Sequence, residues 1–248
     1  MVYVSLVDTN PTHTGPETVA ATVSTDRGST FGRTAGSTVV VNSDNCIGGT
    51  EDQPSAAFDY TTSPPTLWIA WRHRGTDIGV VGLCARRGFI NPSTKNINWI
   101  GSTIVVPASG SESFWGIGGV HVQAADSTVT LVFSGSDHLL ACPSSQTWGE
   151  TWWSITSLDN GSSWLPQMLI MTTNNFRWCI VNGTTQNTTR AFDYVKGADG
   201  NDYVAINDSA NAVRLFMNAK TGDSPWREYC QNFLPDGAGL PAQNWTRP

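Results

Sequence analysis

The chain has 248 residues, a formal net charge of −6, 39% hydrophobic residues and only 14% charged residues. This acidic balance lacks the basic face that nucleic-acid binding requires and does not favour anionic membranes. No apolar run approaches the roughly 18–20 residues of a membrane span, so we expect neither a nucleic-acid partner nor membrane insertion. Residues 1–14 also lack an apolar stretch of signal-peptide length, which indicates a mature domain or a fragment.

Alternating apolar and polar residues predict short β-strands throughout, and no segment has the period of a long amphipathic helix. We name the four strand positions of a repeating unit A to D; the first unit lacks strand A. The units are expected at about residues 1–41, 54–106, 119–171 and 189–234 of a single domain over residues 1–248. In chain order, the strands are expected at residues 2–8, 19–24, 37–41, 55–60, 66–71, 80–85, 102–106, 119–125, 129–133, 152–157, 167–171, 189–194, 203–207, 213–217 and 227–233.

Two unrelated motifs recur at nearly the same spacing. Ala-Phe-Asp-Tyr stands at residues 57–60 and again at 191–194, and an eight-residue motif stands at 24–31 and again at 157–164. Weaker copies lie about halfway between, so the repeat unit has about 65 residues. Repeated groups of four antiparallel strands are typical of a β-propeller. A two-sheet sandwich is the alternative, but it would not explain the shared spacing.

The eight-residue motif resembles the Asp-box, Ser-x-Asp-x-Gly-x-Thr-Trp/Phe, of the sialidase-like (BNR repeat) propellers. The resemblance implies that the motif forms a turn between strands C and D, opposite the active-site face, with a structural role. That family contains sialidases, other glycosidases, polysaccharide lyases, lectins and scaffolds, so the fold does not choose a function. The matching residues are Asp26, Gly28, Phe31, Asp159, Gly161 and Trp164.

The sequence therefore predicts an all-β protein with about four four-stranded blades. The four units could close a ring if residues 237–248 supply the missing strand A of the first unit. Alternatively, these residues open a fifth blade, and the chain is a fragment of a six- or seven-bladed ring. The oligomeric state stays open.

If the Asp-box marks one face, the D–A and B–C loops form the other face and should hold any ligand site. Aromatic rings stack on sugars, and arginines and carboxylates bind hydroxyl or acidic groups. The two tryptophans could instead plug the central channel. The candidate ligand-binding residues are Arg72, Arg74, Trp115, Arg177, Trp178 and Arg190. Carboxylates that could serve glycoside hydrolysis are Glu51, Asp52, Glu112 and Asp137.

No cofactor is required by any motif, although Asp44, Glu51 and Asp52 offer oxygen ligands suited to Ca²⁺ on one expected loop. The alternative is an ordinary solvated loop. The protein has few lysines and five cysteines, which fits an extracellular protein with disulfides. The expected pairs are Cys46 with Cys84 and Cys179 with Cys230, leaving Cys142; five reduced thiols are the alternative.

The favoured function is an extracellular module that binds glycans or proteins without catalysis. Sialidases resemble one another in an Arg-Ile-Pro-like segment ahead of the first Asp-box, and this sequence has none. Tyr60 and Tyr194, beside Asp59 and Asp193, recur in the repeats and are interpreted as blade architecture rather than as a catalytic centre. The alternatives are a sialidase-like exo-glycosidase, whole or partial, and a structural module of a surface assembly.

Overall fold

The computed structural model describes residues 2–8, 17–24, 26–30, 38–40, 49–75, 81–106, 120–136, 148–176, 178–181, 184–187, 192–207, 213–219 and 225–233, and all structural statements refer to these. Every regular element among them is a β-strand. No helix in the described ranges is long and apolar enough to span a membrane.

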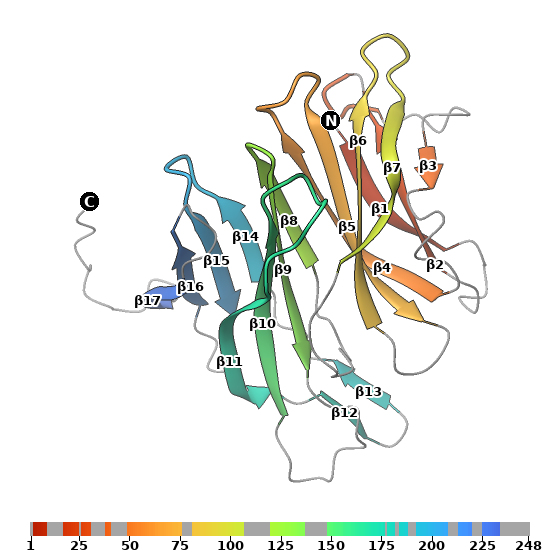
Figure 1. Ribbon diagram of the computed structural model, residues 1–248. Helices are drawn as coiled ribbons and strands as arrows, with labels where there is room; N and C mark the ends of the chain where they lie inside the picture. Colours follow the sequence, from red (N-terminus) through yellow and green to blue (C-terminus); the bar gives the residue numbers. More distant parts are fainter. Residues whose placement is uncertain are drawn as a thin grey trace.

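Four antiparallel sheets follow one another along the sequence (Figure 1). In each sheet, strands that are consecutive in sequence are neighbours, and a separate hairpin, β12–β13, lies between the third and fourth sheets in sequence. Sheet 1 contains β1 (Val2–Asp8), β2 (Glu17–Val23) and β3 (Thr38–Val40). Sheet 2 contains β4 (Gly49–Asp59), β5 (Thr66–Gly75), β6 (Val81–Ile90) and β7 (Ile97–Val106).

Sheet 3 contains β8 (Val120–Ala125), β9 (Thr128–Ser136), β10 (Trp148–Ser157) and β11 (Met168–Phe176). The hairpin pairs β12 (Trp178–Val181) with β13 (Thr184–Asn187). Sheet 4 contains β14 (Phe192–Lys196), β15 (Asp202–Asn207), β16 (Val213–Asn218) and β17 (Arg227–Phe233). The predicted all-β class is confirmed, and each expected strand overlaps an observed one; the hairpin β12–β13 was not predicted. Residues 237–248 lie outside the described ranges, so the closing strand stays a prediction.

Each pair of consecutive sheets encloses its own hydrophobic core. Alternate residues of β5 point to opposite faces: Leu67, Ile69 and Trp71 belong to the core shared with sheet 1, whereas Trp68 and Ala70 belong to the core shared with sheet 3. A third core lies between sheets 3 and 4. A two-sheet sandwich would have a single core, so the sandwich alternative is wrong, and the three successive cores are those expected between propeller blades.

The first strands of sheets 2, 3 and 4 lie side by side, with β8 between β4 and β14. Two hydrogen bonds join them: the Val122 backbone N–H donates to Ser55 Oγ over 3.2 Å, and Gln123 Nε2 donates to the Tyr194 carbonyl over 3.3 Å. These three strands are the inner strands of their blades, as expected for strand A.

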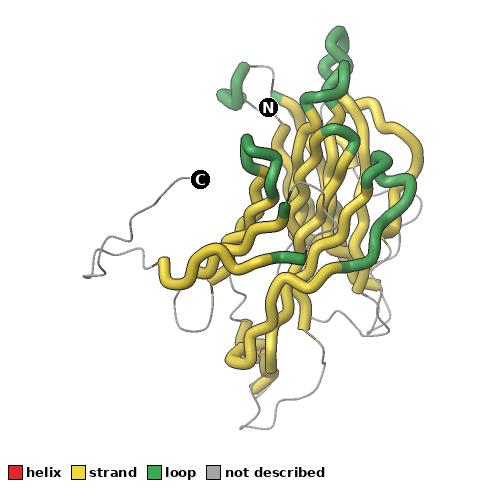
Figure 2. Tube along the Cα trace, turned by 60° about the vertical axis from the view of Figure 1, so that its left-hand side comes forward, coloured by secondary structure: helices red, strands yellow, loops and turns green. Residues whose placement is uncertain are grey.

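The two ends of the stacked sheets differ in their connections. The turns β4–β5, β6–β7, β8–β9, β10–β11 and β14–β15 lie at the upper end in Figure 1, which we call the turn end. Figure 2 shows most of the described turns, in green, gathered there. Because all the strands are antiparallel neighbours, the connections β5–β6, β9–β10 and β15–β16 lie at the opposite end, which we call the loop end.

The two eight-residue motifs form turns with the same hydrogen bonds. In the first, Asp26 Oδ1 accepts the Thr30 N–H at 2.9 Å, and the Gly28 N–H donates to Ser24 Oγ at 2.7 Å. In the second, Asp159 Oδ1 accepts the Ser163 N–H at 2.8 Å, and the Gly161 N–H donates to Ser157 Oγ at 2.7 Å. Gly28 and Gly161 have φ values of 91° and 79°, a conformation that favours glycine. We call these segments the octapeptide turns.

The second octapeptide turn also joins sheet 3 to sheet 2. A Cβ atom on Gly161 would lie 2.6 Å from the Trp68 ring, so the turn packs directly on the core of sheet 2. Arg87 of β6 donates a hydrogen bond to the Asn160 carbonyl at 2.5 Å. Trp164, which matches the closing aromatic residue of the Asp-box, packs against the core between sheets 2 and 3. These contacts give the turn a structural role.

The Ala-Phe-Asp-Tyr copies lie in equivalent strands but at different heights. Asp59 pairs with Thr66 in the last pair before the turn, whereas Asp193 pairs with Ala205, three pairs before the last one. Asp59 is fully buried and Tyr60 is exposed, but Asp193 is exposed and Tyr194 is buried. The repeated residues therefore do not occupy equivalent positions, because the turns that follow the two strands do not begin at the same distance from the motif.

Candidate functional site at the loop end

Several predicted site residues lie in strands rather than in loops. Strand β4 begins at Gly49 and β5 continues to Gly75. Both strands extend beyond the expected residues 55–60 and 66–71. A shift in register between Asp52 and Ser55 accommodates Pro54, which cannot donate a ladder hydrogen bond.

This extension brings four predicted residues together on neighbouring strands. The register pairs Asp52 with Arg72, Glu51 with His73, and Thr50 with Arg74. Arg72 is 3% exposed, and buried guanidinium groups are found with hydrogen-bonding partners because an isolated buried charge is strongly unfavourable. The pairs lie at the loop end of sheet 2, where β4 begins and β5 ends.

Other predicted site residues are not brought into this group by the described part of the structure. Trp178 is the first residue of β12, opposite Asn187 in the hairpin, which lies at the lower end of the molecule in Figure 1. The remaining candidates lie outside the described residues: Asp44, Glu112, Trp115, Asp137, Arg177 and Arg190.

The structure adds a polar pair that the sequence did not indicate. His121 Nδ1 of β8 lies 3.5 Å from Asp193 Oδ1 of β14, with 35% of the His121 side chain and 83% of the Asp193 side chain exposed. The His121 ring also packs edge-on against Phe192, with centroids 4.8 Å apart. Both strands begin at the loop end, so the pair lies on the inner strands near that end. Only the stacking of sheet 4 on sheet 3 brings these residues together.

The environment of His121 favours a neutral imidazole. Burial lowers the pKa of His121, and the Asp193 carboxylate raises it by less. A neutral imidazole offers one hydrogen-bond donor and one acceptor. The pair can therefore present a donor, an acceptor and a carboxylate to a polyhydroxylated ligand.

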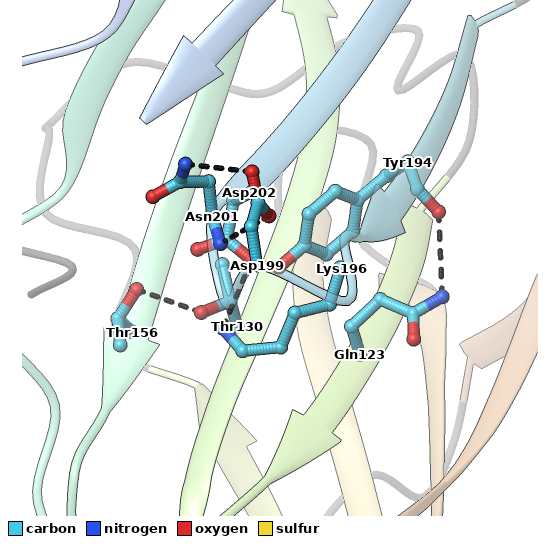
Figure 3. A network of polar contacts seen from close by, with 8 residues as sticks. All are labelled: Gln123, Thr130, Thr156, Tyr194, Lys196, Asp199, Asn201 and Asp202. Atoms are coloured by element: carbon cyan, nitrogen blue, oxygen red, sulfur yellow. Dashed lines mark hydrogen bonds and ion pairs between the residues drawn. The ribbon is translucent and has the colours of Figure 1, made fainter. Parts of the chain in front are cut away.

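A second polar network between sheets 3 and 4 has a buried centre, the Tyr194–Asp202 pair (Figure 3). Tyr194 Oη donates to Asp202 Oδ1 at 2.8 Å, and Lys196 Nζ lies 3.1 Å from the same oxygen. Tyr194 is 2% exposed and Asp202 is 3% exposed. Burial raises the pKa of the Tyr194 phenol, and the Asp202 carboxylate raises it further. This network joins the strands of sheet 4 beside sheet 3.

Neither repeated tyrosine occupies the proposed site. Tyr60 is 77% exposed and follows Asp59 in the β4–β5 turn, which lies at the turn end, and Tyr194 is buried in the network of Figure 3. The buried Tyr194 hydroxyl donates a hydrogen bond to the Asp202 carboxylate. Both positions fit the interpretation of these residues as blade architecture.

Among the described residues, no group of three or more His, Cys, Asp and Glu side chains could hold a metal ion. The expected Ca²⁺ ligands Glu51 and Asp52 are consecutive residues of β4, and Asp44 lies outside the described residues. Cys84 is disulfide-bonded. Its predicted partner Cys46 also lies outside the described residues, as does Cys142.

No protein-family profile matches the sequence, and the comparison with curated proteins found no match. Among solved structures, the sialidase of Trypanosoma rangeli in complex with the inhibitor DANA is similar, with 12% identity and a TM-score of 0.58. That similarity covers 92% of this chain and 36% of the sialidase chain. Another structure of Trypanosoma rangeli sialidase has 11% identity and a TM-score of 0.40 over 79% of this chain and 32% of the other.

The protein thus spans about a third of the length of the sialidases that it matches. At this identity the similarity concerns the fold alone. Together with the sheet topology and the three cores between sheets, it shows an all-β protein with the β-propeller fold of the sialidases.

Proposed function

We propose that this protein is an extracellular Asp-box propeller module that binds glycans, free or on glycoproteins, at its loop end and has no catalytic activity of its own. The observation that carries the proposal is the His121–Asp193 pair on the inner strands near that end. The octapeptide turns, which resemble Asp-boxes, are engaged in turn hydrogen bonds at the opposite end. Binding is therefore proposed where the polar side chains remain accessible.

The group around Arg72 supports the same end of the molecule. Asp52, Arg72, Glu51 and His73 form adjacent register pairs at the start of β4 and the end of β5. Carboxylates and guanidinium groups form charge-assisted hydrogen bonds with sugar hydroxyls and acidic substituents. Arg72 is 3% exposed, so it is proposed to order this edge of the site rather than to contact the ligand itself. The candidates Trp115, Trp178, Arg177 and Arg190 are proposed to add stacking and charge, Trp178 from the hairpin β12–β13.

The extracellular location rests on the disulfide of Cys84, since disulfides persist mainly in oxidising compartments. The non-catalytic assignment rests on two observations. The sequence lacks the Arg-Ile-Pro-like segment, and Tyr194 is buried with its proton held by Asp202.

The second candidate function is a sialidase-like glycoside hydrolase. It is favoured by the similarity to a sialidase fold and by the strand register, which pairs the acidic residues Glu51 and Asp52 with His73 and Arg72. A third candidate, a structural module of a surface assembly, would neither bind glycans nor turn them over.

A glycan array combined with a panel of fluorogenic glycosides, including sialosides, separates these functions. We expect binding without turnover, and a His121→Ala variant should weaken binding by about tenfold, the effect of losing roughly 1.4 kcal/mol of contacts. Tyr60→Ala, which changes an exposed aromatic residue at the turn end, is the control and should bind normally.

If the wild type turned over a glycoside and Glu51→Gln or Asp52→Asn abolished this turnover, the protein would be a hydrolase rather than a binding module. Absence of both binding and turnover would favour the structural module. Normal glycan binding by His121→Ala would show that the binding site does not lie at the His121–Asp193 pair.

A further inference from the structure

Asn160 and Gly161 form a reactive sequence within the second octapeptide turn. When glycine follows asparagine, the glycine backbone nitrogen can lose its proton and attack the asparagine Cγ. A bond forms between this nitrogen and Cγ, the bond from Cγ to the amide nitrogen Nδ2 breaks, and ammonia leaves. Water then opens the cyclic imide at either carbonyl, which gives aspartate or isoaspartate.

Three hydrogen bonds hold the backbone N–H and carbonyl groups of this pair in the folded protein. The Asn160 N–H donates to the Ser127 carbonyl at 2.9 Å, and the Asn160 carbonyl accepts from Arg87 Nη1 at 2.5 Å. The Gly161 N–H, which must lose its proton to react, donates to Ser157 Oγ at 2.7 Å. The Gly161 nitrogen, which would attack, is thus already a hydrogen-bond donor. The Asn160 carbonyl group bonded to it is held by Arg87 of sheet 2.

The packing also opposes the attack. Asn160 has φ 56° and Gly161 has φ 79°, and a Cβ atom at Gly161 would meet the Trp68 ring at 2.6 Å, so the backbone has little room to rotate. Asn160 Oδ1 is buried and has no hydrogen-bond partner in the described structure. Attack would place negative charge on this oxygen, and donors that stabilise such an oxyanion normally lower the barrier.

We propose that Asn160–Gly161 is a conformation-gated deamidation site. It is closed while the second octapeptide turn is docked on sheet 2, and it reacts when the turn detaches. Conversion to isoaspartate would insert a methylene group into the backbone and displace the carbonyl that Arg87 binds. The modification would therefore leave sheets 2 and 3 less firmly joined.

The test is peptide mapping by mass spectrometry of aspartate and isoaspartate at residue 160 during incubation in mildly alkaline buffer. The folded protein should deamidate at Asn160 at least about tenfold more slowly than the protein in urea, as expected when an opening free energy of at least about 1.4 kcal/mol precedes reaction. Asn182, the other asparagine followed by glycine, verifies in the urea sample that the conditions permit the reaction.

Two variants test the gate. Arg87→Ala, which does not touch the reacting atoms, and Ser157→Ala should each accelerate the reaction at Asn160 by several-fold in the folded protein. Ser24→Ala removes the equivalent hydroxyl from the first octapeptide turn and should leave the rate unchanged. Circular dichroism confirms that each variant is folded.

Equal rates at Asn160 in the folded protein and in urea would overturn the proposal. So would a protected wild type whose rate is unaffected by both Arg87→Ala and Ser157→Ala, because the barrier would then lie elsewhere.

Discussion

Asp26 and Asp159 are held in their ionised form by the octapeptide turns. Hydrogen bonds from the Thr30 hydroxyl and from the Ser163 hydroxyl are the largest causes, and they lower the pKa of Asp26 and of Asp159 from 3.8 to about 2. A carboxyl group whose pKa is lower in the folded state stabilises the fold above its unfolded pKa of about 3.9. This contribution is lost as the pH falls through the folded pKa.

We predict that the double variant Asp26→Asn, Asp159→Asn unfolds at a lower temperature than the wild type at pH 7. Its stability should also decline less steeply between pH 4 and pH 2, because neither amide titrates. Thermal unfolding at a series of pH values measures both effects. Identical slopes for variant and wild type would show that other carboxyl groups dominate acid unfolding.

Asp59 and Asp193 have the same sequence neighbours but opposite surroundings, which makes them a matched pair. Asp59 is fully buried and accepts hydrogen bonds from the backbone N–H groups of Thr61 and Ser127, the second of which belongs to sheet 3. We predict that Asp59→Ala lowers the free energy of unfolding by about 1–3 kcal/mol, since it leaves these donors unsatisfied.

The control for this prediction is Asp193→Ala, which removes an exposed side chain and should change stability by less than about 0.5 kcal/mol. Chemical denaturation of both variants provides the comparison. Equal losses of unfolding free energy in the two variants would mean that the buried Asp59 hydrogen bonds do not stabilise the contact between sheets 2 and 3.

At the scale of the element, a tryptophan at or just after the C–D turn of sheets 2, 3 and 4 packs on the preceding sheet. Trp99 packs against the core between sheets 1 and 2, Trp164 against the core between sheets 2 and 3, and Trp226 against the core between sheets 3 and 4. Within the described ranges, only the Trp226 indole combines this packing with a hydrogen bond, from Nε1 to Ser154 Oγ at 2.8 Å. Trp164 Nε1 is buried without a partner among the described residues.

We predict that Trp226→Phe is more destabilising than Trp164→Phe, by about 1 kcal/mol, because only the first substitution removes a hydrogen bond. A double-mutant cycle with Ser154→Ala should show that the Trp226→Phe and Ser154→Ala effects are not additive. Additive effects, or a larger loss for Trp164→Phe, would contradict the role given to this hydrogen bond.

At the scale of the whole molecule, sheets 2 and 3 are covered by a core on both faces. In sheet 4, Val204 and Ile206 face sheet 3, whereas Val195 is 54% exposed and Tyr229 is 46% exposed. We predict that backbone amides of Leu67–Trp71 and Val129–Phe133 exchange hydrogen most slowly, and that those of β14–β17 exchange faster through local opening. Hydrogen-exchange mass spectrometry measures this order. Uniform protection would indicate that the sheets open only together.

The sequence by itself determined the strands and the octapeptide turns, because both depend on local interactions. The alternation of apolar residues requires no distant partner, and the hydrogen bonds of Asp26 and Asp159 stay within eight consecutive residues. The resemblance to the Asp-box also indicated Trp164 as the closing aromatic residue of its turn. These features can therefore be predicted from the sequence without knowing how the sheets stack on one another.

Only the tertiary structure decided what each repeated residue does. Stacking of the sheets buries Asp59, exposes Asp193 and brings His121 of β8 to within 3.5 Å of Asp193. The register of β4 with β5 made strand residues of Asp52 and Arg72, which the sequence had placed in loops. Contacts between residues about 70 positions apart depend on strand register and turn length, and the repeat pattern specifies neither to within one residue.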